Sequence, residues 1–320
     1  MQTSFLDREW QVPFGIAPMG MCDLFWPGAD KAMAKLARDN GLPLGVSTMS
    51  SATLEQLFDL AAGNAWFQLY AGESDELTHK LVDRAVSAGY QALILTADVP
   101  ALAPRQRDLR NGFKVPFRIG PKQALDFACH LQWTLATLKN GRPKPRNVNS
   151  QPKAATAEGS IGQFRREAGR GRFDWNFLRE LRTQWPHKLI LKGVMCAQDA
   201  KNAVDAGADA VYVSNHGGRQ LDSAPAAIAM LPSIRDALDC DVPVVFDSGV
   251  RSGEDIARTL ASGAGFVMLG RPFLYALGAG GAGGLSQLLN LLTNELSTVM
   301  AQLGCTHPAQ LNSTVRASVR

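Results

Sequence analysis

The segment VYVSNHGGRQLD, residues 211–222, carries the strongest chemical signal in the sequence. An apolar run delivers His216 into a Gly-Gly turn, and Arg219 follows three residues later. Glycines let the backbone and a substrate approach each other closely. A neighbouring arginine disfavours the imidazolium form of a histidine, which leaves the imidazole available as a general base. The alternative is a surface turn with an incidental histidine, and the length of the block from Ser214 to Leu221 disfavours it.

Other charged or glycine-rich segments also follow apolar runs. Lys192 ends the run KLILKG, where it is either a surface residue or a buried cation that needs an anionic partner. The segments FDSGVRSGEDI and MLGRPF, residues 246–256 and 268–273, combine glycines with arginines and suit a phosphate monoester. Asp98 either caps a helix or orients a histidine, and Arg105 either has a functional role or is one more charge in a basic loop.

Repeated strand and helix patterns must position these residues. The apolar runs that precede the polar residues number eight and read as strands: Phe14–Ala17, Leu44–Val46, Trp66–Leu69, Leu93–Thr96, Leu189–Leu191, Ala210–Val213, Val244–Phe246 and Phe266–Leu269. Amphipathic patterns between them predict helices that include Asp30–Asn40, Asp75–Ala88, Ala197–Ala206 and Gly253–Ser262. This alternation predicts a (β/α)8 TIM barrel, with a ring-shaped site where the strands end.

Composition and charge limit the class of protein. The 320 residues are 46% hydrophobic and 19% charged, which excludes a disordered chain and suits a single domain over residues 1–320. The net charge of +4 is uneven, because residues 104–172 hold 15 Lys and Arg against 4 Asp and Glu. A uniformly basic nucleic-acid binder is therefore not expected. We predict instead a variable basic insert or lid at residues 112–172, after the fourth strand.

The five cysteines are odd in number and widely spaced, and they form no CxxC pair. This pattern predicts no zinc cage and no other metal site, and it suggests buried thiols in a reducing compartment. The sequence has no run of 18 apolar residues and no signal-peptide core near its first residue. We expect a cytoplasmic protein.

Seven ordered motifs resemble one enzyme family: APMGM, WFQLYA, LTADVP, LKGV, SNHGGRQLD, DSGVRSG and GRPF. The chain is similar to FMN-dependent L-2-hydroxy acid oxidases and dehydrogenases, which include glycolate oxidase, lactate oxidase, mandelate dehydrogenase and flavocytochrome b2. The resemblance extends from Val12 to about Leu285, outside the insert. It implies an FMN-binding barrel that oxidises an L-2-hydroxy acid, such as lactate, glycolate or mandelate, to a 2-oxo acid. The electrons would pass to oxygen, a quinone or another acceptor.

The resemblance also assigns roles to individual residues. The catalytic set is His216 as base, Asp98 as its carboxylate partner, Tyr70 near the substrate hydroxyl and Lys192 at the flavin N1/O2 edge. The substrate-binding set is Arg219, Arg105 and Tyr70. The cofactor-binding set is Ala17, Pro18, Met19, Ser47, Gln68, Thr96, Lys192, Ser214, Asp247, Gly249, Arg251, Gly270 and Arg271. The chain departs from the family at Ser248, where a second glycine is usual, and at Pro104, where a second arginine often precedes the one matched to Arg105.

Two other functions remain open at this point. Relatives carry an N-terminal helical segment that covers the substrate, and we expect it to be absent here, so the chain could bind FMN with little activity. An FMN-dependent isomerase is the less favoured alternative, since such enzymes need a diphosphate site and not the pair of His216 and Arg219.

The insert suggests a further partner. Residues 112–155 place Phe113, Phe117, Phe127 and Trp133 among positive charges, which suits peripheral contact with an anionic membrane on its inner face. The alternative, which we favour, is a mobile lid over the active site with a solvated charged surface. The family resemblance also implies a homo-oligomer, specifically a tetramer.

Overall fold

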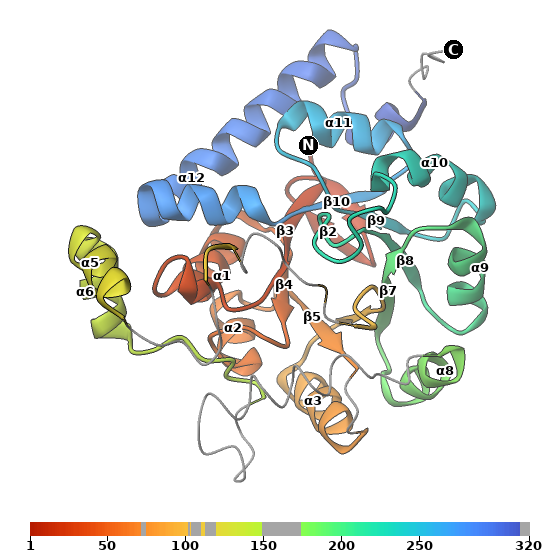
Figure 1. The fold of residues 1–320 in the computed structure, drawn as a ribbon. Coiled ribbons are helices and arrows are strands. Elements are labelled where there is room, and N and C mark those ends of the chain that lie inside the picture. The colour runs from red at the N-terminus through yellow and green to blue at the C-terminus, as the bar shows by residue number, and fades with distance from the viewer. Residues whose placement is uncertain (72–74, 102, 104–109, 113–119, 149–173, 314–320) are drawn as a thin grey trace.

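The computed structural model describes residues 1–71, 75–101, 103, 110–112, 120–148 and 174–313. Eight parallel strands close into a barrel in the order β10-β3-β4-β5-β6-β7-β8-β9 (Figure 1). The strands are β3 Phe14–Met19, β4 Leu44–Ser47, β5 Ala65–Tyr70, β6 Ala92–Thr96, β7 Lys188–Val194, β8 Ala210–Val213, β9 Val244–Phe246 and β10 Phe266–Leu269. All eight predicted strands and the predicted TIM barrel are confirmed. They are recognisable because their side chains are buried on both faces.

Helices surround the barrel and follow its strands (Figure 1). They are α1 Ala29–Asn40, α2 Leu54–Leu60, α3 Asp75–Ala88, α8 Trp175–Gln184, α9 Ala197–Asp205, α10 Ala227–Ala237, α11 Gly253–Ala261 and α12 Arg271–Gln302, with short 3-10 turns at Cys22–Leu24 and Pro308–Ser313. Local chemistry sets their ends. Ser252 and Asp255 form a reciprocal capping box at the start of α11, and Gly41, with φ +59°, ends α1.

A β-hairpin that sequence reasoning missed closes the amino end of the barrel. Its strands are β1 Thr3–Phe5 and β2 Arg8–Trp10. Phe5 and Trp10 pack on Trp66 and Phe266, with ring centroids 5.1 to 6.4 Å apart. These strands are too short to show a period, so only their packing reveals them. The hairpin therefore lies at the end of the barrel opposite the carboxyl ends of the eight strands.

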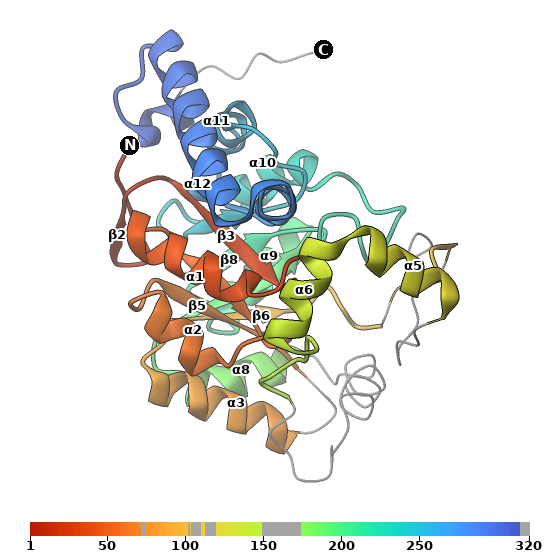
Figure 2. The ribbon, with the colours of Figure 1, turned by 90° about the vertical axis from the view of Figure 1, so that its left-hand side faces the viewer.

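The described part of the predicted insert contains two helices, α5 Pro121–Cys129 and α6 Leu131–Asn140. They form a hairpin at the end of the barrel opposite β2 (Figure 2). Neither helix has a buried residue. Residues 113–119 and 149–173 of the predicted insert, with Phe113 and Phe117, lie outside the described residues, so the insert as a whole stays a prediction.

The chain that leaves α6 returns to the barrel without regular structure. Asn147 is 0% exposed, and Pro145 and Val148 are buried beside it. The Asn147 carboxamide accepts a hydrogen bond from Leu54 N over 2.8 Å and donates to Ser50 Oγ over 3.0 Å. It also donates to Ser47 O over 3.3 Å. The base of the hairpin is therefore anchored to the loop that follows β4.

The cysteines differ in their exposure to solvent. Of the cysteines, Cys22 is buried, but Cys129, Cys196 and Cys240 are exposed and Cys305 is half-buried, so the prediction of uniformly buried thiols was wrong. Free cysteines are often buried because they behave as small apolar groups, yet surface helices and loops also tolerate them.

In the described ranges, every helix is too short or too polar to cross a membrane.

Candidate active site

Three polar side chains form a buried row across neighbouring strands at the carboxyl ends of the barrel strands. Ser47 Oγ donates to Gln68 Oε1 over 2.9 Å, and Gln68 Nε2 donates to Thr96 Oγ1 over 2.9 Å. The parallel register aligns them, because Ser47 is opposite Gln68, and Thr96 is opposite Tyr70 on the next strand. All three predicted cofactor ligands are therefore brought together. Buried hydroxyl and amide groups in such a row suit a ligand with a polar edge.

A buried cation lies beside this row. Lys192 is opposite Thr96 in the register and is 4% exposed. Its Nζ donates to Ser214 Oγ over 2.8 Å and lies 3.4 Å from Asp98 Oδ2 and 3.7 Å from Asp247 Oδ2. Burial alone would lower the pKa of Lys192, but the two carboxylates outweigh burial and raise it. Lys192 is consequently a fixed positive charge, as the functional interpretation of the sequence required.

His216 and Asp98 form the predicted pair. His216 Nδ1 is 2.9 Å from Asp98 Oδ1, and their side chains are 18% and 10% exposed. Burial would raise the pKa of Asp98, but the charges of Lys192 and His216 lower it overall, so the carboxylate is ionised. The pairing depends on Gly193, because a Cβ on this residue would be 2.6 Å from Asp98 Cβ. Gly193 belongs to the LKGV motif, but the motif alone does not reveal that this glycine lies against Asp98.

Tyr212 is a site residue that sequence reasoning missed. It is fully buried inside the barrel, where its hydroxyl donates to Asp247 Oδ2 over 2.9 Å. Its ring centroid lies 5.3 Å from Lys192 Nζ, which is within the range of a cation–π contact. Burial and the Asp247 charge raise the pKa of Tyr212, so it remains a neutral donor. The signal was a tyrosine at an interior position of a strand, where a hydroxyl needs a partner.

The loops after β9 and β10 bring two arginines together. Burial and the charge of Arg271 lower the pKa of Arg251, which is the effect of two guanidinium groups held near each other. Gly249, with φ +92° and open space around it, leaves its backbone exposed. Arg271 Nη2 also donates to Gly217 O over 2.8 Å, so it supports the turn that carries His216. Paired cations beside an open glycine fit a phosphate group.

The other residues predicted to bind FMN or the substrate lie on several strands and loops. Ala17, Pro18 and Met19 end β3, and Gly270 follows the neighbouring β10, where an added Cβ would lie 3.3 Å from Met19 Sδ. Tyr70 ends β5 and lies near enough to Lys192 to contribute to its raised pKa. Arg219 is exposed on the turn after β8. Arg105 lies outside the described residues, so its predicted role is untested. Taken together, a polar row, a buried cation and an anion site fit the ring system and the phosphate of FMN.

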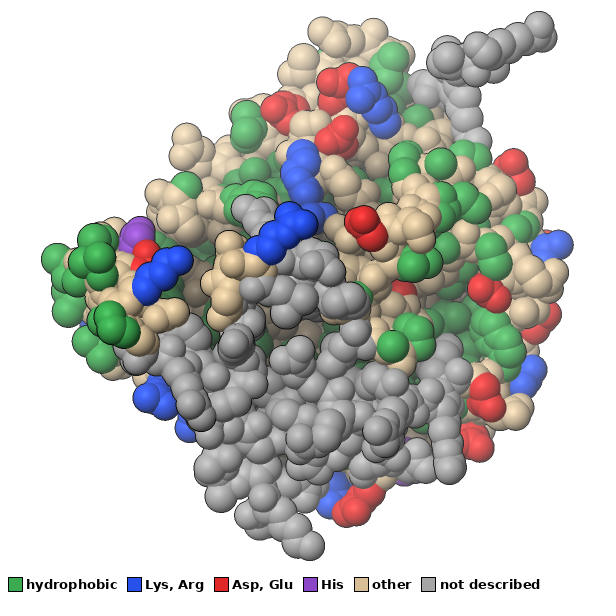
Figure 3. All heavy atoms as spheres, in the orientation of Figure 1, with side chains coloured by type: hydrophobic (Ala, Val, Ile, Leu, Met, Phe, Trp, Pro, Cys, Tyr) green, Lys and Arg blue, Asp and Glu red, His purple; other side chains and the backbone are tan. Residues whose placement is uncertain are grey.

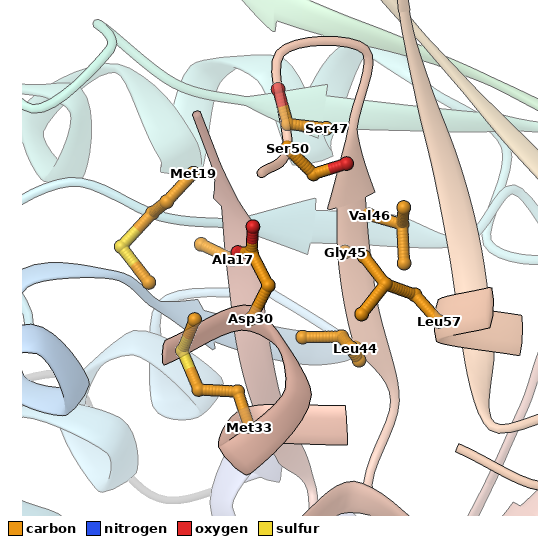
Figure 4. Close-up of a pocket in the computed structure, with 10 residues that line it drawn as sticks. All are labelled: Ala17, Met19, Asp30, Met33, Leu44, Gly45, Val46, Ser47, Ser50 and Leu57. Carbon is orange, nitrogen blue, oxygen red and sulfur yellow. The ribbon is translucent and has the colours of Figure 1, made fainter. Parts of the chain in front are cut away.

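A small cavity adjoins the loop after β4. Its volume is about 10 Å³, and Asp30, Ser47, Ser50 and Met19 contribute to its lining (Figure 4). Asp30 lies at the start of α1, is 5% exposed, and accepts a hydrogen bond from Ser51 N over 2.5 Å. Burial raises the pKa of Asp30 from 3.8 to about 7. The loop that supplies Ser47 is thus held by Asp30 on one side and by Asn147 on the other.

Comparison with known proteins identifies the class of enzyme. Residues 1–317 match the family described as FMN-dependent dehydrogenase. The chain is 38% identical over 306 residues to (S)-mandelate dehydrogenase from Pseudomonas putida, which covers 95% of this chain and 76% of that enzyme. The crystal structure of monotopic membrane protein (S)-mandelate dehydrogenase matches with a TM-score of 0.92 and 37% identity, over 97% of this chain and 82% of that one. Mandelate oxidase with (S)-4-hydroxymandelic acid matches with a TM-score of 0.82 and 33% identity, over 97% and 81%.

These similarities define a flavin-dependent oxidoreductase. The chain belongs to the FMN-dependent dehydrogenase family. The predicted membership in the FMN-dependent 2-hydroxy acid oxidoreductases is confirmed, and so are the enzyme class and FMN as cofactor.

Proposed function

We propose that this enzyme oxidises a 2-hydroxy acid of the mandelate type to the 2-oxo acid, with His216 as the base. The observation that carries the proposal is the buried pair of His216 and Asp98, 2.9 Å apart, next to the charged Lys192. The names of the relatives, (S)-mandelate dehydrogenase and mandelate oxidase, support an aromatic substrate. The electrons removed from the hydroxy acid would then pass from FMN to oxygen, a quinone or another acceptor.

The side chains have separable roles in this proposal. Bound FMN supplies a two-electron acceptor. Asp98 is ionised and faces His216 Nδ1, so this nitrogen keeps its proton and Nε2 is left to accept the proton of the substrate. Lys192 stabilises negative charge that develops near it during reduction. Arg219 and Arg105 orient the substrate carboxylate, and Tyr70 lies on the side of the hydroxyl.

The FMN ligands follow the two parts of the site. Its ring system would lie among Ala17, Pro18, Met19, Ser47, Gln68, Thr96 and Lys192. Its ribityl chain and phosphate would be held by Ser214, Asp247, Gly249, Arg251, Gly270 and Arg271. The buried polar row and the paired arginines support this division, because each provides the donors that its part of FMN needs.

The test is anaerobic mixing of the FMN-loaded enzyme with (S)-mandelate, L-lactate and glycolate while flavin absorbance is recorded. We expect mandelate to bleach the flavin fastest. The His216→Ala variant should retain FMN but bleach about 1,000-fold more slowly, whereas His307→Ala, at an exposed position, should behave like the wild type. Normal bleaching by His216→Ala would refute the base assignment. Full FMN content without bleaching by any of the acids would support the alternative of an FMN-binding barrel with little activity.

We also propose peripheral membrane contact through the α5–α6 hairpin. Four leucines, Leu125, Leu131, Leu135 and Leu138, are 62% to 74% exposed on it, and apolar side chains gather there on the surface (Figure 3). Lys122, Lys139 and Arg142 lie on or next to the same helices. Exposed leucines flanked by cations suit an anionic lipid surface. The similarity to a monotopic membrane protein supports this second proposal.

Co-sedimentation with vesicles that contain phosphatidylglycerol tests the membrane proposal. The wild type should pellet with the vesicles at low salt, and Leu135→Glu and Leu138→Glu should not. Leu291→Glu on α12 is a matched control, because Leu291 is 53% exposed but lies on another surface. A wild type that stays in the supernatant at low salt would favour the lid over the membrane anchor.

A further inference from the structure

The turn that carries His216 has a strained backbone. His216, Gly217 and Gly218 have φ values of 57°, 67° and 71°, which is a run of three residues in the left-handed region. Glycines tolerate this region, but a histidine does not favour it. Such a conformation persists only when surrounding contacts hold it in place. The contacts that hold this turn therefore determine where the imidazole lies.

Ser248, on the neighbouring loop after β9, supplies a side chain that forms hydrogen bonds with this turn. Its Oγ accepts hydrogen bonds from Asn215 N over 3.2 Å and from Gly217 N over 3.1 Å. These two amides lie on either side of His216 in the chain. The same hydroxyl donates to Asp247 Oδ1 over 2.9 Å. One hydroxyl thus uses its donor and both acceptor positions to join the His216 turn to Asp247.

Ser248 itself adopts a conformation that glycine would adopt more easily. Its φ is +89°, and the next residue, Gly249, has φ +92°. A side chain at such a φ is strained whatever space surrounds it. A serine at this strained position is understandable if its hydroxyl makes hydrogen bonds that a glycine could not make. The two bonds to the His216 turn are that contribution.

We propose that Ser248 is a positioning residue for the catalytic step, which fixes His216 through the amides of Asn215 and Gly217. This inference rests on the proposed role of His216 as base. Ser214 has a related place, since its Oγ accepts from His216 N over 3.1 Å and connects the turn to Lys192. Ser248 contacts the same turn from the loop after β9, and its hydroxyl bonds to two backbone amides and to Asp247 rather than to the His216 imidazole.

Two substitutions separate positioning from stability. Ser248→Gly removes the hydroxyl and relieves the strain, so the free energy of unfolding should not fall. Ser248→Ala removes the hydroxyl and keeps the strain, so this variant should be less stable. If the hydroxyl positions His216, kcat for (S)-mandelate should fall about tenfold in both variants, because the turn loses two hydrogen bonds that are each of modest net value. KM and the dissociation constant for FMN should change less than threefold.

The result that would overturn the proposal is a Ser248→Gly enzyme with wild-type kcat. A rate loss confined to Ser248→Ala would also overturn it, because that loss would follow stability and not the hydroxyl. A wild-type enzyme that binds FMN but oxidises none of the three acids would overturn the proposed function, and this inference with it. An active wild type that is matched by Ser248→Gly would overturn only the role of Ser248.

Discussion

Asp30→Asn offers a quantitative test of how burial affects the carboxyl group of Asp30, which lies beside the loop after β4. The carboxyl group of Asp30 is buried, and this raises its pKa from 3.8 to about 7 in the folded protein. The folded state therefore holds the proton more tightly than the unfolded state. The stability that depends on this group is complete below about pH 3.8 and is lost as the pH rises to about 7. The total loss is about 4 kcal/mol.

Of this loss, about 3 kcal/mol falls between pH 5 and pH 8. Asparagine keeps an oxygen that can accept from Ser51 N but does not titrate. The difference in free energy of unfolding between Asp30→Asn and the wild type should thus change by about 3 kcal/mol in favour of the variant between these pH values. Urea unfolding of the FMN-saturated proteins, followed by tryptophan fluorescence at each pH, gives this difference. Titration of other groups cancels because both proteins contain them.

Asp236→Asn is the matched control, since it removes an exposed carboxylate on α10 and should leave the pH dependence unchanged. A change below about 1 kcal/mol for Asp30→Asn would refute the reasoning. It would mean that the cavity next to Asp30, which has room for about one water molecule, solvates the carboxylate well enough to offset burial.

Three further predictions concern the site. Asp98→Asn should lower kcat/KM for (S)-mandelate by about 10- to 100-fold, because it removes the charge that faces His216 Nδ1; a change below threefold in steady-state assays would contradict this. Tyr212→Phe should lower the free energy of unfolding by about 2 kcal/mol in urea titrations, because Asp247 loses a buried donor; unchanged stability would show that water replaces it. Asn147→Ala should lower the melting temperature and weaken FMN binding in a fluorescence titration, since Leu54 N loses its partner and Ser47 O keeps only the bond from Ser50 N, whereas the exposed Asn140→Ala should change neither.

The sequence was informative where structure depends on neighbouring residues. Each strand of the barrel, such as β6, reads as a short apolar run because both of its faces are buried. The predicted helix Asp75–Ala88 agrees with α3 at both ends, and the other predicted helices differ from the structure by one residue at one end. The pairing of His216 with Asp98 was expected from the family resemblance, and the structure brings the two together.

The sequence did not predict the role of a residue where that role depends on contacts between distant segments of the chain. Asn147 bonds to Ser47, which is 100 positions away, and nothing in its immediate sequence distinguishes it from the other asparagines of a polar stretch. Ser248 looked like a mild departure from a glycine, because its bonds to Asn215 and Gly217 cross between two strands. Positive φ values likewise follow from tertiary contacts and leave no periodic pattern.

The closed amino end of the barrel has a consequence for the order of events in turnover. At the amino ends of the strands, Phe266 and Trp66 pack against Phe5 and Trp10 of the β1–β2 hairpin, and Ile190 belongs to the same buried apolar cluster. Because side chains fill the amino end of the barrel, the proposed reaction requires access from the carboxyl ends of the strands. Under the proposed role of His216 as base, the proton that Nε2 accepts and the 2-oxo acid product would leave by this same end of the barrel. A shared route would couple product release to the deprotonation of His216.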